Sequence, residues 1–181
     1  METKIIYFVH GTTTDNASKL CSGWKEAMLN DLGREQAYNL GEISRNREDK
    51  FDLIFTSDLK RAIESSNIAF PGYKKIIDKR LRECNYGDLD GANKNLVIYQ
   101  EHIDDAFVNG ESLIDVENRV RSFLIDVKKN YSGKTIGIVA HRAPQLALEV
   151  ILNGLTWESA IKSDWRKTGD WKPGWVYIIK D

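Results

Sequence analysis

An apolar run near the N-terminus, Ile5-Ile6-Tyr7-Phe8-Val9, stops abruptly at His10-Gly11. Its β-branched and aromatic side chains predict a buried strand. A histidine that follows such a strand lies at the carboxyl edge of a sheet, which is where ligands bind in open α/β folds. Gly11 lets a ligand approach the backbone, and Thr13 and Asn16 add hydrogen-bonding groups. The competing interpretation is a polar turn whose histidine packs locally.

Strand-like and helix-like segments alternate along the rest of the chain. We expect further strands at residues 51–55, 75–77, 135–140 and 175–179, and helices at about 31–44, after Asp58, at 113–130, at 144–153 and at 157–162. Residues 84–110 show no periodicity and are expected to form a long excursion above the sheet. This alternation predicts one α/β domain spanning residues 1–181, with a mostly parallel central sheet covered by helices on both faces.

Two of the predicted helices have specific core faces. In the helix at 31–44, Asn30 is the expected cap, and the apolar face is Leu32, Ala37, Leu40 and Ile43. In the helix after Asp58, that aspartate is the expected cap, and the core face is Leu59, Ala62, Ile63, Ser66 and Ala69. Arg61 lies off that face, near the start of the helix.

Charge and cysteine content limit the class of function. The 26 Lys and Arg residues nearly balance the 27 Asp and Glu residues, for a net charge of -1. We therefore expect neither a nucleic-acid surface nor a membrane surface, and any anion site has to be local. Cys21 and Cys84 match no metal-binding spacing, which favours free thiols and no metal or other cofactor. Without a signal-peptide pattern or a long apolar run, a cytoplasmic location is expected.

Four residues with reactive or charged side chains follow the predicted parallel strands. His10, Arg61, Glu83 and His141 each fall at or just after a strand's carboxyl end, and such ends share one edge of a parallel sheet. This set suits phosphoryl transfer. A neutral imidazole can attack phosphorus, a guanidinium can bind phosphate oxygens, and a protonated glutamate can give its proton to a leaving alkoxide.

Several segments, in order along nearly the whole chain, resemble motifs of the histidine phosphatase superfamily, the phosphoglycerate-mutase-like group. They are VHGTTTDN at 9–16, similar to R-H-G-x-T-x-x-N; SDLKRA at 57–62, similar to S-x-L-x-R-A; LRECNYG at 81–87 with Gly91, similar to L-x-E…G…G; GES at 110–112, similar to G-E-S; and VAH at 139–141, similar to the strand before the second histidine. SGW at 22–24 also resembles the mutase branch.

The resemblance implies a three-layer α/β/α fold and a metal-independent reaction on a small phosphomonoester. It implies that His10 is phosphorylated, that Glu83 is the general acid and base, and that Arg61 and His141 bind and polarise the phosphoryl group. The implied pocket-lining residues are Asn16, Ser22, Gly23 and Tyr86. Assembly as a homodimer stays open.

Two departures from the family pattern bear on function. Val9 replaces the arginine of the first motif, and Arg142 replaces the usual glycine after the second histidine. Arg142 follows a strand end and precedes a helix, so we expect its side chain to compensate partly for the lost arginine; the alternative is a solvent-facing arginine. The leading interpretation is a phosphomonoester hydrolase. A phosphoglycerate mutase and a non-catalytic phospholigand-binding protein are the alternatives.

Tryptophans and cations gather near the C-terminus. Trp157, Trp165, Trp171 and Trp175 lie among Lys162, Arg166, Lys167 and Lys172. The simple expectation is that the tryptophans pack the last helix and strand onto the sheet. The sharper hypothesis is that one or two of them wall the substrate pocket together with a neighbouring cation.

Overall fold

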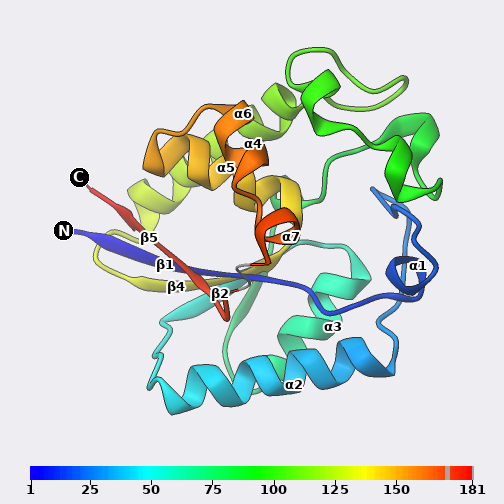
Figure 1. Cartoon of the computed structure of the whole chain (residues 1–181). Helices are drawn as coiled ribbons and strands as arrows, with labels where there is room; N and C mark the ends of the chain where they lie inside the picture. The colour runs from blue at the N-terminus through cyan, green and yellow to red at the C-terminus, as the bar shows by residue number, and fades with distance from the viewer. Residues whose placement is uncertain (170–171, 181) are drawn as a thin grey trace.

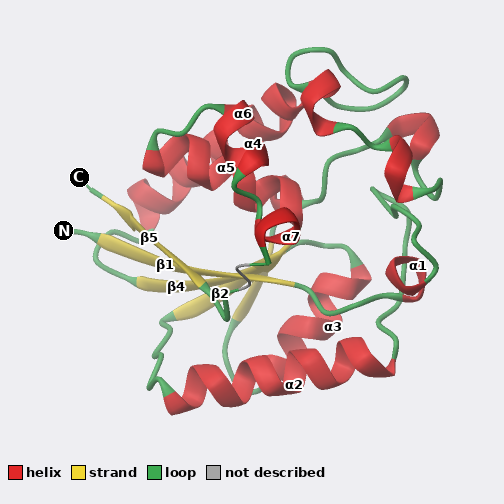
Figure 2. Cartoon of the chain, viewed as in Figure 1, coloured by secondary structure: helices red, strands yellow, loops and turns green. Residues whose placement is uncertain are grey.

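A computed structural model describes residues 1–169 and 172–180, and a twisted sheet runs through the middle of this part of the chain (Figures 1 and 2). Its strands lie in the order β3-β2-β4-β1-β5. The strands are β1 (Thr3–Val9), β2 (Leu53–Thr56), β3 (Lys75–Ile77), β4 (Thr135–Ala140) and β5 (Trp175–Ile179). Only the edge pairing of β5 with β1 is antiparallel among these strands. The predicted mostly parallel sheet is confirmed.

Helices cover both faces of the sheet. They are α1 (Thr14–Ala17), α2 (Asp31–Asn46), α3 (Lys60–Ala69), α4 (Leu113–Asn130), α5 (Arg142–Asn153), α6 (Trp157–Lys162) and α7 (Trp165–Thr168). Figure 1 shows α2 and α3 on one side of the sheet, and α4, α5 and α6 on the other. The predicted excursion contains the short 3₁₀ helices η2 (Gly87–Leu89), η3 (Lys94–Leu96) and η4 (Tyr99–His102), preceded by η1 (Lys79–Leu81).

The alternation of β1 side chains explains the two layers of helices. Ile5 and Tyr7 belong to the larger core, which α4 and α5 complete, whereas Ile6 and Phe8 belong to the smaller core with Leu40 of α2. Successive strand residues point to opposite faces, so an uninterrupted apolar run is stable only where both faces are covered. The N-terminal run therefore requires the layered fold.

Several sequence expectations need correction. Leu32 does not join the core face of α2 and is 52% exposed, because Gly33 and Ala37 make the buried contacts instead. Asp58 does not cap α3: the N-cap is Leu59, without a side-chain cap. The Asp58 carboxylate instead accepts two hydrogen bonds from Arg82, at 2.8 and 2.6 Å. The strand predicted at 51–55 runs from Leu53 to Thr56.

Both cysteines are buried free thiols, as expected from their spacing. Within the described ranges, no helix has the length and apolar character needed to cross a lipid bilayer.

A buried tyrosine ties the ends of the two central strands together. The Tyr7 hydroxyl donates to the His141 carbonyl at 2.7 Å and accepts from the His141 backbone N–H at 3.0 Å. Tyr7 is fully buried, so without this hydroxyl both backbone groups would lack a partner in a water-poor interior. The tie fixes the backbone at the point where β4 ends and α5 begins.

We expect Tyr7→Phe to lower the free energy of unfolding by about 1–3 kcal/mol, because it leaves buried backbone groups unsatisfied. Urea denaturation measures the change. Tyr38→Phe, which alters a 55% exposed tyrosine on α2, is the matched control and should stay within about 0.5 kcal/mol of the wild type. Equal stabilities of the two variants would show that the tie contributes nothing.

Candidate active site

His10 directly follows β1, and one of its ring nitrogens is committed to the backbone. Nδ1 lies 2.7 Å from the Gly11 carbonyl oxygen. A carbonyl only accepts, so Nδ1 carries the proton and Nε2 keeps a free lone pair. Gly11 is required by close packing, because a Cβ there would lie 2.2 Å from the Gly33 carbonyl oxygen. The local geometry thus orients the imidazole with Nε2 as its nucleophilic atom.

His141 is the N-cap of α5 and lies beside His10. The two ring centroids are 5.0 Å apart, at an interplanar angle of 61°. His141 is fully buried, and within the described part of the chain neither of its ring nitrogens has a hydrogen-bond partner. Buried polar atoms are usually hydrogen-bonded, so these nitrogens are suited to contact a ligand bound beside the two rings.

Arg61 enters the same site from the first turn of α3. Although predicted to lie off the core face of the helix, it is only 2% exposed. Its Nη1 donates to the Lys25 carbonyl at 3.0 Å and its Nη2 to the Gly23 carbonyl at 2.6 Å. Gly23 has φ of +52° and no room for a Cβ beside Asp90. Backbone carbonyls thus hold a buried guanidinium at the edge of the sheet.

Burial and positive neighbours keep both histidines neutral. The pKa of His10 is lowered to about 3, first by burial and then by the charges of Arg61 and Arg166. The pKa of His141 is lowered well below its ordinary value by burial, then by Arg61 and His10. A neutral imidazole is the form that can act as a nucleophile or accept a proton.

The Glu83 side chain lies at the N-terminus of α5, next to the histidine that precedes this helix. Its Oε1 accepts from the backbone N–H groups of Cys84 and Ala143, both at 2.9 Å, and Oε2 accepts from the Arg142 N–H at 3.2 Å. The side chain is 8% exposed. The first N–H groups of α5 thus fix the position of the Glu83 side chain. Oε2, held by one longer hydrogen bond, is the oxygen better placed to exchange a proton.

Arg119 of α4 fixes the segment that carries Glu83, and no sequence pattern singled it out. Its Nη1 donates to the carbonyls of Arg80 and Arg82 at 2.7 and 2.8 Å, and its Nη2 donates to the Glu83 carbonyl at 2.9 Å. Trp24 Nε1 donates to the same Glu83 carbonyl at 2.8 Å. A planar guanidinium satisfies several carbonyls at once, so this contact orients the glutamate's backbone.

The predicted pocket-lining residues occupy structured positions around the site. Thr13 and Asn16 form the capping box of α1. Ser22 donates to Asp15 at 2.9 Å, and the buried Tyr86 hydroxyl lies 2.7 Å from that of Tyr99. Their roles as substrate ligands, like that of Gly23, stay predictions.

Arg142 takes part in the site through both its backbone and its side chain. Its N–H group holds Glu83, whereas its Nε donates to Asp164 Oδ2 at 2.5 Å and its guanidinium lies 4.1 Å from the Tyr99 ring centroid. Asp164 is 2% exposed and is a further charged group that no sequence pattern placed here, whereas Arg166 beside it is one of four cations expected near the tryptophans. The only sequence signal of Asp164 is its position as a helix cap.

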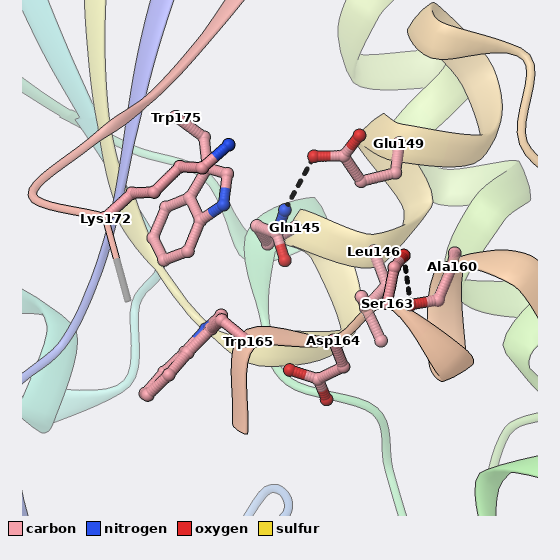
Figure 3. A pocket seen from close by; sticks show the side chains of 9 residues that line it. All are labelled: Gln145, Leu146, Glu149, Ala160, Ser163, Asp164, Trp165, Lys172 and Trp175. Atoms are coloured by element: carbon pink, nitrogen blue, oxygen red, sulfur yellow. Dashed lines mark hydrogen bonds between the residues drawn. The ribbon is translucent and has the colours of Figure 1, made fainter. Parts of the chain in front are cut away.

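A cavity of about 460 Å³ lies beside the site, between α5, α6, α7 and β5 (Figure 3). Trp165 and Trp175 line it, with ring centroids 6.2 Å apart. Trp157 instead packs in the core and donates from Nε1 to Glu117 at 2.8 Å, and Trp171 lies outside the described residues. A tryptophan-walled substrate pocket stays a prediction.

Metal independence also stays a prediction. Across residues 1–169 and 172–180, no three His, Cys, Asp or Glu side chains form a group suited to a metal ion.

The lowered histidine pKa values predict how stability depends on pH. The unfolded chain takes up protons at its histidines near pH 6.5, whereas folded His10 does so only near pH 3. The free energy of unfolding should therefore fall as the pH drops from 6.5 toward 3.

Urea denaturation at several pH values measures this dependence. His10→Gln removes one of the two groups responsible and should lose less stability over that range than the wild type. The same slope in both proteins would contradict the neutral, buried state of His10.

Comparison with known proteins identifies the family of this chain. Residues 6–169 match the model of the histidine phosphatase superfamily (branch 1). A phosphoglycerate mutase of Schizosaccharomyces pombe is 33% identical over 172 residues, covering 86% of this chain and 82% of the relative. A 2,3-bisphosphoglycerate-dependent phosphoglycerate mutase of Methylorubrum extorquens is 31% identical over 175 residues, with the same coverage of 86% and 82%.

Solved structures with this fold include phosphatases. A mycobacterial glucosyl-3-phosphoglycerate phosphatase in complex with VO3 aligns with a TM-score of 0.78 and 26% identity, over 87% of this chain and 85% of that one. The alpha-ribazole phosphatase of Shigella flexneri aligns with a TM-score of 0.76 and 25% identity, over 90% and 84%. The family match extends over most of the chain, and this protein belongs to the histidine phosphatase superfamily.

Proposed function

We propose that the protein hydrolyses a small phosphomonoester through a phosphohistidine formed on His10. The histidine pair is the observation that carries this proposal. The Gly11 carbonyl fixes the tautomer of His10 and leaves Nε2 free. The ring centroid of the buried, neutral His141 lies 5.0 Å from that of His10. A nucleophile that needs no deprotonation, beside a cation, suits attack on phosphorus.

In the proposed reaction, Nε2 of His10 forms a bond to phosphorus while the bond from phosphorus to the substrate's ester oxygen breaks. Glu83 gives its proton to that departing oxygen, so the alcohol leaves neutral. Glu83 then takes a proton from a water molecule, whose oxygen attacks phosphorus and breaks the P–N bond. Inorganic phosphate leaves and His10 returns to its neutral form. Arg61 and His141 hold the phosphoryl oxygens through both steps.

A phosphoglycerate mutase is the second candidate, favoured by relatives of that name at 31–33% identity. The same phosphohistidine would then pass its phosphoryl group to a hydroxyl of the bound glycerate rather than to water. Incubation with 3-phosphoglycerate, followed by phosphorus NMR, separates the two. Release of inorganic phosphate supports the phosphatase, and formation of 2-phosphoglycerate supports the mutase.

Rapid-quench labelling tests the intermediate. With a substrate whose phosphorus is radiolabelled, label should be trapped on the wild-type protein, be lost in acid and persist in base, as expected of a phosphorus–nitrogen bond. His10→Ala should carry no label and have no turnover, while His102→Ala, at a histidine in the excursion, should label normally. Label retained in His10→Ala would place the nucleophile elsewhere, and tight binding without turnover would favour a non-catalytic phospholigand-binding protein.

Glu83→Gln tests the proton donor. A donor matters most when the leaving group is a poor one, so turnover of an alkyl phosphate should fall by about 100-fold or more, and turnover of nitrophenyl phosphate much less. Glu35→Gln, at an exposed position on α2, is the control and should leave both rates unchanged. Equal losses on the two substrates would mean that Glu83 supports the fold rather than transferring the proton.

A further inference from the structure

Arg166 of α7 brings a second positive charge to the histidine pair. Its charge lowers the pKa of both His10 and His141, as that of Arg61 also does. The N-cap of α7, Asp164, is hydrogen-bonded to the side chain of Arg142, the residue after His141, so α7 is tied to the segment that carries the second histidine. In Figure 1, α7 lies on the face of the sheet covered by α4, α5 and α6. Arg166 reaches the site from the C-terminal part of the chain, far in sequence from the other site residues.

Asp164 connects Arg166 to the rest of the site. Its Oδ1 accepts from the Arg166 backbone N–H at 3.0 Å and lies 3.9 Å from Arg166 Nη1. Its Oδ2 accepts from Arg142 Nε at 2.5 Å, and the Arg142 N–H holds Glu83. Since Asp164 is buried, one carboxylate compensates two arginines and fixes their positions relative to the glutamate.

The two arginines beside Asp164 differ in what they can still bind. The Arg142 side chain is 20% exposed, donates a short hydrogen bond to Asp164 and has its guanidinium carbon 4.1 Å from the Tyr99 ring centroid. The Arg166 side chain is 33% exposed, and its contact of 3.9 Å with Asp164 is longer than a hydrogen bond. Its guanidinium carbon lies 4.5 Å from the Trp165 ring centroid. Within residues 1–169 and 172–180 the Arg166 guanidinium donates no hydrogen bond, so its donors are available to a ligand.

The other groups at the site neutralise only part of the negative charge of a phosphoryl dianion. Arg61 uses one N–H of each terminal nitrogen on a backbone carbonyl, which leaves only part of its donors for the phosphoryl group. His10 and His141 are neutral, and Val9 beside His10 is apolar. Several fixed hydrogen-bond donors are required to stabilise the negative charge that develops on the phosphoryl oxygens during the transfer. A partly exposed cation that is linked to the site through Asp164 and Arg142 meets this need.

We propose that Arg166 is the second arginine that binds the phosphoryl group, held in place by Asp164, and that Arg142 is a positioning residue for Glu83 and Asp164. This inference rests on the proposed function for its ligand, a phosphoryl group. It replaces the expectation that the Arg142 side chain itself fills that role.

The test compares Arg166→Ala, Arg166→Lys and Lys167→Ala. Lys167 is the exposed neighbour of Arg166 on α7, so its variant makes the same change in net charge without removing the proposed contact. Circular dichroism and thermal unfolding verify that each variant is folded. Turnover of nitrophenyl phosphate and binding of orthovanadate, by isothermal titration calorimetry, are then measured.

We expect Arg166→Ala to lower kcat by about 10- to 100-fold, toward the lower end of the range for losing one preorganised donor because the side chain is partly exposed. Vanadate affinity should fall by a similar factor. Arg166→Lys should recover part of both losses, and Lys167→Ala should stay within about twofold of the wild type. Arg166→Ala values that match those of Lys167→Ala in both assays would overturn the inference.

The vanadate-binding measurement distinguishes a failure of this inference from a failure of the proposed function. If no phosphohistidine forms in the wild type but Arg166→Ala alone weakens vanadate binding, the inference holds and the proposed hydrolysis fails. If phosphohistidine forms normally and vanadate binds wild type and Arg166→Ala equally, the inference fails and the proposed hydrolysis stands. A wild type that binds no vanadate would overturn both.

Discussion

The register between the two central strands is the constraint on which the site depends. β1 and β4 run parallel, with Val9 paired to Ala140, so the next residue of each strand is a histidine. The Tyr7 hydroxyl then bonds both backbone groups of His141. A shift of one residue would turn every side chain of the strand to the opposite face and separate the imidazoles. The apolar packing that sets this register is therefore also what brings the two rings within 5.0 Å.

Burial then determines the chemical state of that pair. Two imidazoles beside buried Arg61 stay neutral because an additional positive charge would be poorly solvated and would be repelled by the guanidinium. The site thus has its positive charge on arginines, which do not lose it at neutral pH. The nucleophile that we propose, Nε2 of His10, is a neutral nitrogen. Such a division of roles allows an anionic substrate to be bound without protonating the atom that has to attack it.

Sequence patterns were sufficient for the features that depend on local order. Strand ends identified His10 and His141, and the alternation of strands and helices indicated the parallel sheet. Periodicity failed where a long-range contact decided the outcome. Asp58 has the residue type of a helix cap but pairs with Arg82, and Arg61 lies off an apolar stripe but is buried against carbonyls.

The missed residues at the site share that physical origin. Arg119 and Asp164 act through hydrogen bonds to segments 20 or more positions away in the chain, and no spacing rule encodes such pairings. Arg166 was only one cation among several near the C-terminus. Its significance depends on the buried carboxylate beside it, a property that requires the folded chain.

The position of Glu83, the proton donor that we propose, depends on several elements at once. Its carboxylate is held by α5 N–H groups, while its backbone carbonyl is held by Arg119 from α4 and by Trp24. Hydrogen bonds at both ends of the residue restrict rotation of the side chain, and a general acid works only when its proton is within reach of the leaving oxygen. That oxygen can belong to a departing alcohol, to an incoming water or to a hydroxyl of a bound glycerate. Which of these it is depends on the residues around the edge of the sheet. The excursion at 84–110 and the segment of α6 and α7 both contact Arg142, through Tyr99 and Asp164, so differences among related enzymes in substrate and acceptor are expected to concentrate there rather than in the histidine pair.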